Sequence, residues 1–241
     1  MRKNLLFSAM TIVFSTVLFA QENKTEEPRK TGHYNENKFR QLNEEIMASP
    51  NMYRSASGAP GPEYYQQKAD YKMNLELDDK NAKLYGSETI TYHNNAPDKL
   101  EYLWLQLDQN MRAPQSLTPL QESQRISPAY TPDRFAKQYM EEPFQGGFHI
   151  DYVKDAKGNA MSYTINQTMM RINLAQPLKP GEKITFSIKW WYNINNYRVD
   201  GGRSGYEEFE DGNRLYVIAQ FYPRMAVYSD FEGWQNMQFW G

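Results

Sequence analysis

The three histidines of the chain, His33, His93 and His149, are the first candidates for chemistry, because histidine is the usual proton-transfer and metal-binding side chain near neutral pH. None lies in an H-E-x-x-H motif, and none has a second histidine at metal-ligand spacing. The chain has no cysteine, which excludes a thiol nucleophile, and no serine lies in a G-x-S-x-G turn. We therefore expect His33 to be a surface residue and the other two to be ordinary strand residues.

Two further groups of residues have types that could bind a ligand. The stretch DGGRSGYEEFEDG, Asp200 to Gly212, combines glycines with acids and could hold a cation or cradle an anion. It lacks the lysine of a phosphate loop and the acid spacing of a calcium loop, so we interpret it as a solvated hairpin loop. The adjacent Trp190 and Trp191 could stack on sugar rings, but strand alternation would place at least one of them in the core.

The stretch IAQFYPRMAVYSD, Ile218 to Asp230, carries three polar side chains among apolar ones: Gln220, Arg224 and Asp230. Its pattern predicts a buried strand, continuous with Arg214 to Phe221, that runs into a turn. Buried polar groups need hydrogen-bond partners. One interpretation of Gln220 is therefore an ordinary strand residue satisfied by backbone groups, and the other is a functional side chain.

These residues must be positioned by short segments in which apolar and polar residues alternate, the pattern of half-buried β-strands. In YKMNLELD, residues 71–78, the apolar set Tyr71, Met73, Leu75 and Leu77 is expected to face the core. Further strands are predicted at residues 84–92, 100–108, 147–155, 158–165, 169–175, 183–194 and 214–221. The 100–108 segment is apolar on both faces and is expected to be central.

Helical spacing is confined to two places. Residues 35–49 are expected to form a short amphipathic helix, and Thr131 is a candidate N-cap for a second within the long segment 111–146. Short strands joined by turn residues, with so little helix, predict a mainly β fold. We expect an antiparallel β-sandwich or saddle-like sheet with one or two short helices.

The amino terminus predicts export. Residues 1–20 have two basic residues, an apolar run and Ala20, as in a secretory signal peptide. Its removal leaves 25 basic and 29 acidic residues, a net charge of −4, which disfavours a nucleic-acid partner. We expect residues 21–62 to be a polar lead, short helix and linker, and residues 63–241 to be one β domain. The mature protein would be secreted or periplasmic in a bacterial envelope, without a stable membrane anchor.

Three stretches in this order resemble one protein family. They are YYQQKADYKMNLELDDKNAKLYGSETITYHNNAPDKLEYLWLQLDQN, then GNAMSYTINQTMMRINLAQPLKPGEKITFSIKWWYNI, then IAQFYPRMAVYSDFEGW. Together they are similar to the amino-terminal domain of secreted zinc aminopeptidases of the aminopeptidase N type (gluzincins), in the form common in Bacteroidetes. The resemblance covers roughly residues 35–241. It implies a saddle-like β domain that packs on a thermolysin-like catalytic domain.

The resemblance also implies roles for particular residues. Gln220 in AQFYP matches the glutamine that borders the substrate cleft and helps fix the amino end of the peptide. Arg224 and Asp230 match an R-x-x-x-x-x-D run and are expected to form a structural ion pair. The G-x-M-E-N and H-E-x-x-H motifs of the catalytic domain are not in this sequence. We therefore expect a fragment with no catalytic residues and no cofactor of its own, inactive alone, with zinc held in the missing catalytic domain.

An alternative of another class is a stand-alone envelope β-sandwich that binds a glycan or a protein through exposed aromatics and the long 111–146 segment. It predicts a polar, well-covered surface around Gln220. The fragment hypothesis predicts instead exposed apolar side chains at that end, where the catalytic domain would dock. Under the fragment hypothesis, the partners would be the missing catalytic domain and the peptide substrate of the full enzyme.

Overall fold

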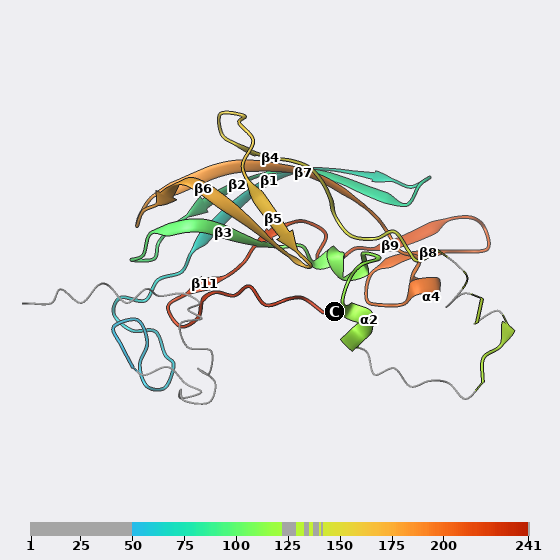
Figure 1. Cartoon of the computed structure of the whole chain (residues 1–241), viewed down its shortest axis with the longest axis horizontal. Coiled ribbons are helices and arrows are strands. Elements are labelled where there is room, and N and C mark those ends of the chain that lie inside the picture. The colour runs from blue at the N-terminus through green and yellow to red at the C-terminus, as the bar shows by residue number, and fades with distance from the viewer. Residues whose placement is uncertain (1–49, 122–128, 133–134, 137–139, 141, 241) are drawn as a thin grey trace, which may run out of the picture. The chain divides into compact units, whose positions relative to one another are not determined.

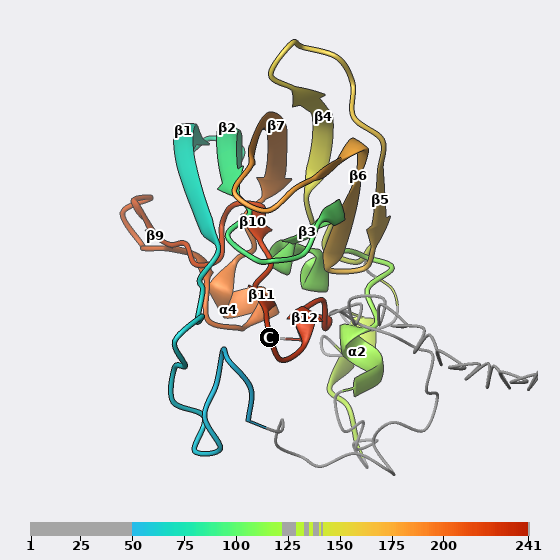
Figure 2. The same ribbon diagram turned by 90° about the vertical axis from the view of Figure 1, so that its left-hand side faces the viewer.

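Two antiparallel β-sheets make up most of the structure. The computed structural model describes residues 50–121, 129–132, 135, 136, 140 and 142–240. The first sheet has the order β1-β2-β7-β4 and the second β10-β3-β6-β5. Figure 1 shows them as two layers, with β3, β6 and β5 below the first sheet, and Figure 2 shows β1, β2, β7 and β4 side by side. The predicted mainly β, antiparallel sandwich is confirmed.

The strands follow the predicted segments closely. Those of the first sheet are β1 Lys68–Asp78, β2 Lys83–His93, β4 His149–Asp155 and β7 Lys183–Asn193. Those of the second are β3 Leu100–Gln106, β5 Tyr163–Asn166, β6 Met169–Leu178 and β10 Arg224–Met225. As expected from its apolar character, β3 is central, with β10 on one side and β6 on the other.

The remaining elements are short. Two hairpins form two-stranded sheets, β8 Gly205–Glu208 with β9 Arg214–Val217 and β11 Tyr228–Ser229 with β12 Gly233–Trp234. The helices are η1 Asp108–Arg112, a 3-10 helix, α2 Thr118–Gln121 and α4 Tyr197–Asp200. Pro132, Phe135 and Ala136 are also helical, and the Phe135 N–H donates to the Thr131 carbonyl, as predicted for this segment.

The core lies between the two sheets and is built by strand alternation. Phe186, Ile188 and Trp190 of β7 face Leu103 and Leu105 of β3 across one continuous apolar cluster. Burying each such side chain contributes about 1.5–3 kcal/mol before entropy costs. Alternation thus explains how a chain without disulfides forms a substantial core.

The structure corrects three local expectations. The predicted strand 214–221 ends at Val217, and the predicted strand 100–108 ends at Gln106, so that Asp108 begins η1. Leu75 and Leu77 are exposed on the edge strand β1, although Leu84, opposite Leu77 on β2, is buried. The predicted signal peptide, the polar lead up to residue 49 and the helix at 35–49 lie outside the described residues.

No helix in the described part of the chain is long and apolar enough to cross a membrane.

Candidate functional site

Gln220 lies in a bend after β9, outside any strand. Its φ is 47°, in the left-handed region that costs a side-chain-bearing residue roughly 1–2 kcal/mol. The bend is held from η1, where the Gln109 Nε2 donates to the carbonyls of Ala219, at 2.8 Å, and Gln220, at 3.3 Å. The prediction that Gln220 belongs to a strand was wrong. The bend aims its side chain away from the sheet ladder.

The side-chain amide of Gln220 has a defined orientation. Arg203 Nη2 lies 2.9 Å from Gln220 Oε1. Because a guanidinium group has only donors, the amide atom facing it must be the oxygen. Gln220 therefore directs its Nε2 donor group to the other side, and its Oε1 keeps one further lone pair that could accept a hydrogen bond.

The 3-10 helix η1 supplies a buried acid beside this bend. Asp108 is 2% exposed, and its Oδ2 accepts from Arg224 Nε at 3.0 Å and Nη2 at 2.9 Å. Burial raises the pKa of Asp108, while the charges of Arg224 and Arg203 oppose that rise. Asp108 Oδ1 is buried with no hydrogen-bond partner among the described residues.

At its other end η1 carries Arg112. Arg112 Nη1 donates to Gln109 Oε1 at 3.3 Å, which links it to the residue that holds the Gln220 bend. Its guanidinium lies against Gly202, where a Cβ would come within 2.8 Å of Nη2. Gly202 also has a φ of 90°, a conformation that favours glycine at this position. Burial lowers the pKa of Arg112, and the positive charge of Arg203 acts in the same direction.

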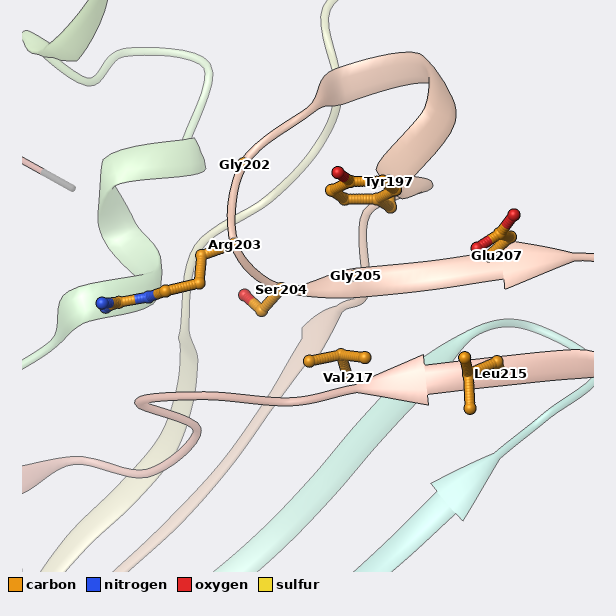
Figure 3. A pocket seen from close by; sticks show the side chains of 8 residues that line it. All are labelled: Tyr197, Gly202, Arg203, Ser204, Gly205, Glu207, Leu215 and Val217. Atoms are coloured by element: carbon orange, nitrogen blue, oxygen red, sulfur yellow. The ribbon is translucent and has the colours of Figure 1, made fainter.

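A cavity of about 270 Å³ lies next to this cluster, between α4 and the β8-β9 hairpin. Figure 3 shows Arg203 extending from this loop toward the 3-10 helix, while Val217 and Leu215 line the other side. These two apolar side chains are 53% and 51% exposed, and Tyr197 and Val199 of α4 are about half exposed. The predicted solvated hairpin loop at 200–212 is correct only for residues 209–212, which are exposed and join β8 to β9. Residues 201–204 instead form the loop before β8, with Ser204 buried, and this loop positions Arg203.

Arg224 and Asp230 do not pair with each other. Strand β10 pairs with β3 so that Arg224 lies opposite Gln106 and reaches Asp108 just beyond it. Asp230 lies in the β11-β12 turn, where both its carboxylate oxygens accept from Arg54 Nε at 2.9 Å. The expected Arg224–Asp230 ion pair is thus wrong, because strand pairing gives each residue a nearer partner that is distant in sequence.

The other sequence candidates are structural. His93 at the end of β2 hydrogen-bonds Asp70, and His149 of β4 stacks on Trp191 with ring centroids 3.8 Å apart. Lys83 Nζ lies over the same indole at 4.5 Å, from the strand that flanks β7 on the opposite side. With His149 and Lys83 against its ring, Trp191 is poorly placed to stack on a sugar. Trp190 is in the core, as alternation predicted.

Metal ligands are not gathered anywhere in the described parts of the chain: no three acidic or histidine side chains lie together there.

Sequence reasoning missed Glu88, Arg112 and Arg203. Glu88 is 2% exposed, and burial raises its pKa to about 9. Neither of its carboxyl oxygens has a partner among the residues that the structure describes. Alternation could have found it, since Glu88 lies in register with the inward-facing Ile90 and Tyr92. Nothing in the local pattern marks the two arginines, which meet only in the folded chain.

Comparisons with known proteins give similarity at the level of the fold. No protein-family profile and no curated protein matches the chain. Similar solved structures include an M1 zinc metallopeptidase from Deinococcus radiodurans, in a mutant form, at 14% identity and a TM-score of 0.35. That match covers 62% of this chain and 25% of the other.

Two related matches are two-domain M1 zinc metallopeptidase mutants, one bound to L-tryptophan and one to L-arginine. Their TM-scores are both 0.34, at 14% and 13% identity, and they cover 57% and 60% of this chain. This chain spans about a quarter of these proteins, 23% and 27% of their respective lengths. The likeness assigns no site residue and no activity to this chain.

Proposed function

We propose that this chain is the non-catalytic amino-terminal β domain of an exported aminopeptidase-like zinc metallopeptidase. It would pack on the catalytic domain and border the peptide cleft through Gln220. The protein would act in the bacterial periplasm or outside the cell, with zinc held by the catalytic domain. The sequence resemblance motivates the proposal, and the surface beside Gln220 is the structural observation that supports it.

That surface is apolar where a stand-alone module would need a polar one. Leu215 and Val217 of β9 are each about half exposed, directly before the Gln220 bend. Val227, Phe231 and Met237 are exposed farther along the chain. Leu215 and Val217 line one cavity together with the half-exposed Tyr197, and apolar exposure gathered in this way is typical of surfaces that are covered by another domain. We therefore favour a docking surface over the stand-alone glycan or protein binder.

Docking is tested by placing a charge on this surface. In the isolated 241-residue chain, Val217→Asp should change the free energy of unfolding by less than about 0.5 kcal/mol, since the side chain is half exposed. In the complete enzyme the same change should weaken domain packing and lower the melting temperature. Ile165→Asp, at an exposed β5 position, is the matched control. Equal effects of the two changes in the complete enzyme would contradict the proposal.

The role of Gln220 is tested with Gln220→Gly in the complete enzyme, because glycine accepts the left-handed backbone while removing the side chain with its amide. Loss of one hydrogen bond, worth about 0.5–1.5 kcal/mol, should lower kcat/KM for short peptides by up to about tenfold. Gln167→Gly is the control, since Gln167 also has a positive φ, of 52°, in the β5-β6 turn, and glycine keeps the backbone carbonyl that accepts from Asn110. If Gln220→Gly left kcat/KM unchanged, Gln220 would have no role in peptide binding.

As an expectation, the isolated chain binds no catalytic zinc. Metal analysis of the purified chain tests this, and stoichiometric zinc linked to peptidase activity would refute the proposal.

A further inference from the structure

Two of the arginines near Gln220 have no acidic ion-pair partner among the residues that the structure describes. The described ion pairs of arginine join Arg54, Arg198, Arg214 and Arg224 to nearby carboxylates. Arg112 and Arg203 are not among them. Each donates one side-chain hydrogen bond among the described residues, and in both cases the acceptor is a neutral glutamine amide oxygen.

The two guanidinium groups are held near each other by the fold. Arg112 lies against Gly202, the residue next to Arg203, and their charges interact. Half-burial of Arg112 removes water that would otherwise screen it. Two like charges kept together in this way are costly unless an anion joins them, and planar guanidinium groups match the geometry of a carboxylate.

The nearby acids do not neutralise this pair. Asp108 is engaged by Arg224, although its charge is also felt by Arg203. Asp200 affects Arg112 from an exposed position at the end of α4, beyond ion-pair distance. The three arginines and two acids leave the cluster with a net charge of +1, and the excess lies at Arg112 and Arg203.

A buried hydroxyl is an independent sign of a missing acceptor. Tyr192 of β7 is buried, and its hydroxyl has no hydrogen-bond partner in the described part of the chain. It is close enough to Arg112 for the two to interact electrostatically. The Tyr192 hydroxyl and the Gln220 Nε2 can both donate to an oxyanion, while Asp108 Oδ1, which also lacks a described partner, belongs to the carboxylate that Arg224 already engages.

We propose that Arg112 and Arg203, with Gln220 Nε2, form a binding site for a peptide carboxylate. The identity of the ligand as a peptide rests on the proposed function, whereas the anion site follows from the cluster itself. The carboxylate could belong to an acidic side chain or to a carboxyl terminus, and the site would select acidic over basic peptides.

The test is a titration of the purified 241-residue chain with blocked dipeptides, followed by NMR chemical shifts at low salt. The probes are acetyl-Glu-Ala-amide, its neutral isostere acetyl-Gln-Ala-amide, and acetyl-Ala-Ala with a free carboxyl terminus. At least one carboxylate probe should bind about tenfold more tightly than the neutral probe, the size of one charge-assisted hydrogen bond. The carboxylate probe that binds more tightly shows whether the bound carboxylate belongs to an acidic side chain or to a carboxyl terminus.

Variants locate the site. Arg203→Met should weaken binding of the preferred probe at least tenfold, and because Arg203 is exposed the chain should still fold. Arg112→Met should weaken binding to a similar extent. Arg198→Met should leave binding unchanged, because Arg198 of α4 is already paired with Glu207 of β8. Added salt should weaken binding.

The proposal is overturned if no carboxylate probe exceeds the neutral one, or if Arg203→Met binds as the unmodified chain does. Tighter binding of inorganic phosphate than of either carboxylate would overturn the assignment to carboxylates. Failure here would leave the docking proposal standing, because that proposal is tested by Val217→Asp and Gln220→Gly in the complete enzyme.

Discussion

Glu88 and Asp108 are both buried acids, but only Asp108 has a cation beside it. Glu88 lies in the middle of β2, facing the sandwich core, and its oxygens have no partner among the described residues. Asp108 lies just beyond the end of β3, where it accepts a hydrogen bond from Arg224 Nε and forms an ion pair with the same guanidinium group. Burial raises the pKa of both, yet in Asp108 the arginine opposes the rise.

The difference shows two ways of burying a carboxyl group. Without a partner, the group avoids the desolvation cost by keeping its proton, as expected for Glu88 near neutral pH. With a guanidinium partner, it can stay charged, but the charge then depends on that partner. The core region should therefore respond to pH, and the η1 region to mutation of Arg224.

The largest expected effect is the pH dependence of stability from Glu88. The unfolded chain releases this proton near pH 4.5, whereas the folded chain keeps it to about pH 9. Stability should therefore fall as pH rises between these values, by up to about 1.4 kcal/mol per pH unit, and reach a cost of about 3 kcal/mol at pH 7. Glu88→Gln should remove this slope in urea unfolding measured from pH 5 to 8.

The same substitution at an exposed site is the control for the pH experiment. Glu76→Gln on the neighbouring strand β1 should leave the slope unchanged, since Glu76 is exposed. If Glu88→Gln and the unmodified chain had equal slopes, Glu88 would not retain its proton in the core, and the contrast with Asp108 would disappear.

A smaller effect is expected from Arg224→Met, which leaves Asp108 buried and unpaired. Removing one partner of a fully buried pair costs about 3–5 kcal/mol, and the 39% exposure of Arg224 should reduce this to about 2 kcal/mol. The double change Asp108→Asn with Arg224→Met should recover part of the loss, because no charge is then buried. If the free-energy losses of Asp108→Asn and Arg224→Met, each measured alone by urea unfolding, summed to the loss of the double change, the pair would not be coupled.

The smallest effect is expected at an exposed pair of the same kind. Arg198 and Glu207 form an ion pair on α4 and β8, where solvent screens the charges. Arg198→Met should cost less than about 1 kcal/mol in the same urea experiment. A loss as large as that of Arg224→Met would mean that burial does not govern the strength of these pairs.

Most of the fold could be predicted because it depends on local alternation. The inward sets of β2 and β7 follow directly from period two, and the same rule applied to Glu88 would have predicted a buried acid. The predicted strand 214–221 was too long because apolar residues continue past Val217, while side chains of η1 hold the backbone in a bend.

The candidate site was predictable only in part. Gln220 could be singled out from the resemblance, but its partner Arg203 lies 17 positions away and Gln109 more than a hundred. The ion pairs of Arg224 and Asp230 likewise join segments distant in sequence. Contacts of this kind depend on strand order, which periodicity does not determine.

Strand β1 has a further consequence for the behaviour of the protein at high concentration. It is an eleven-residue edge strand whose far end exposes Leu75 and Leu77. The unpaired backbone groups of such a strand can form hydrogen bonds with the sheet edge of another molecule. Its other face carries Lys68, Asp70 and Lys72, and such charges oppose aggregation through the sheet edge. The charged residues of β1 therefore help to keep neighbouring copies of the sandwich apart.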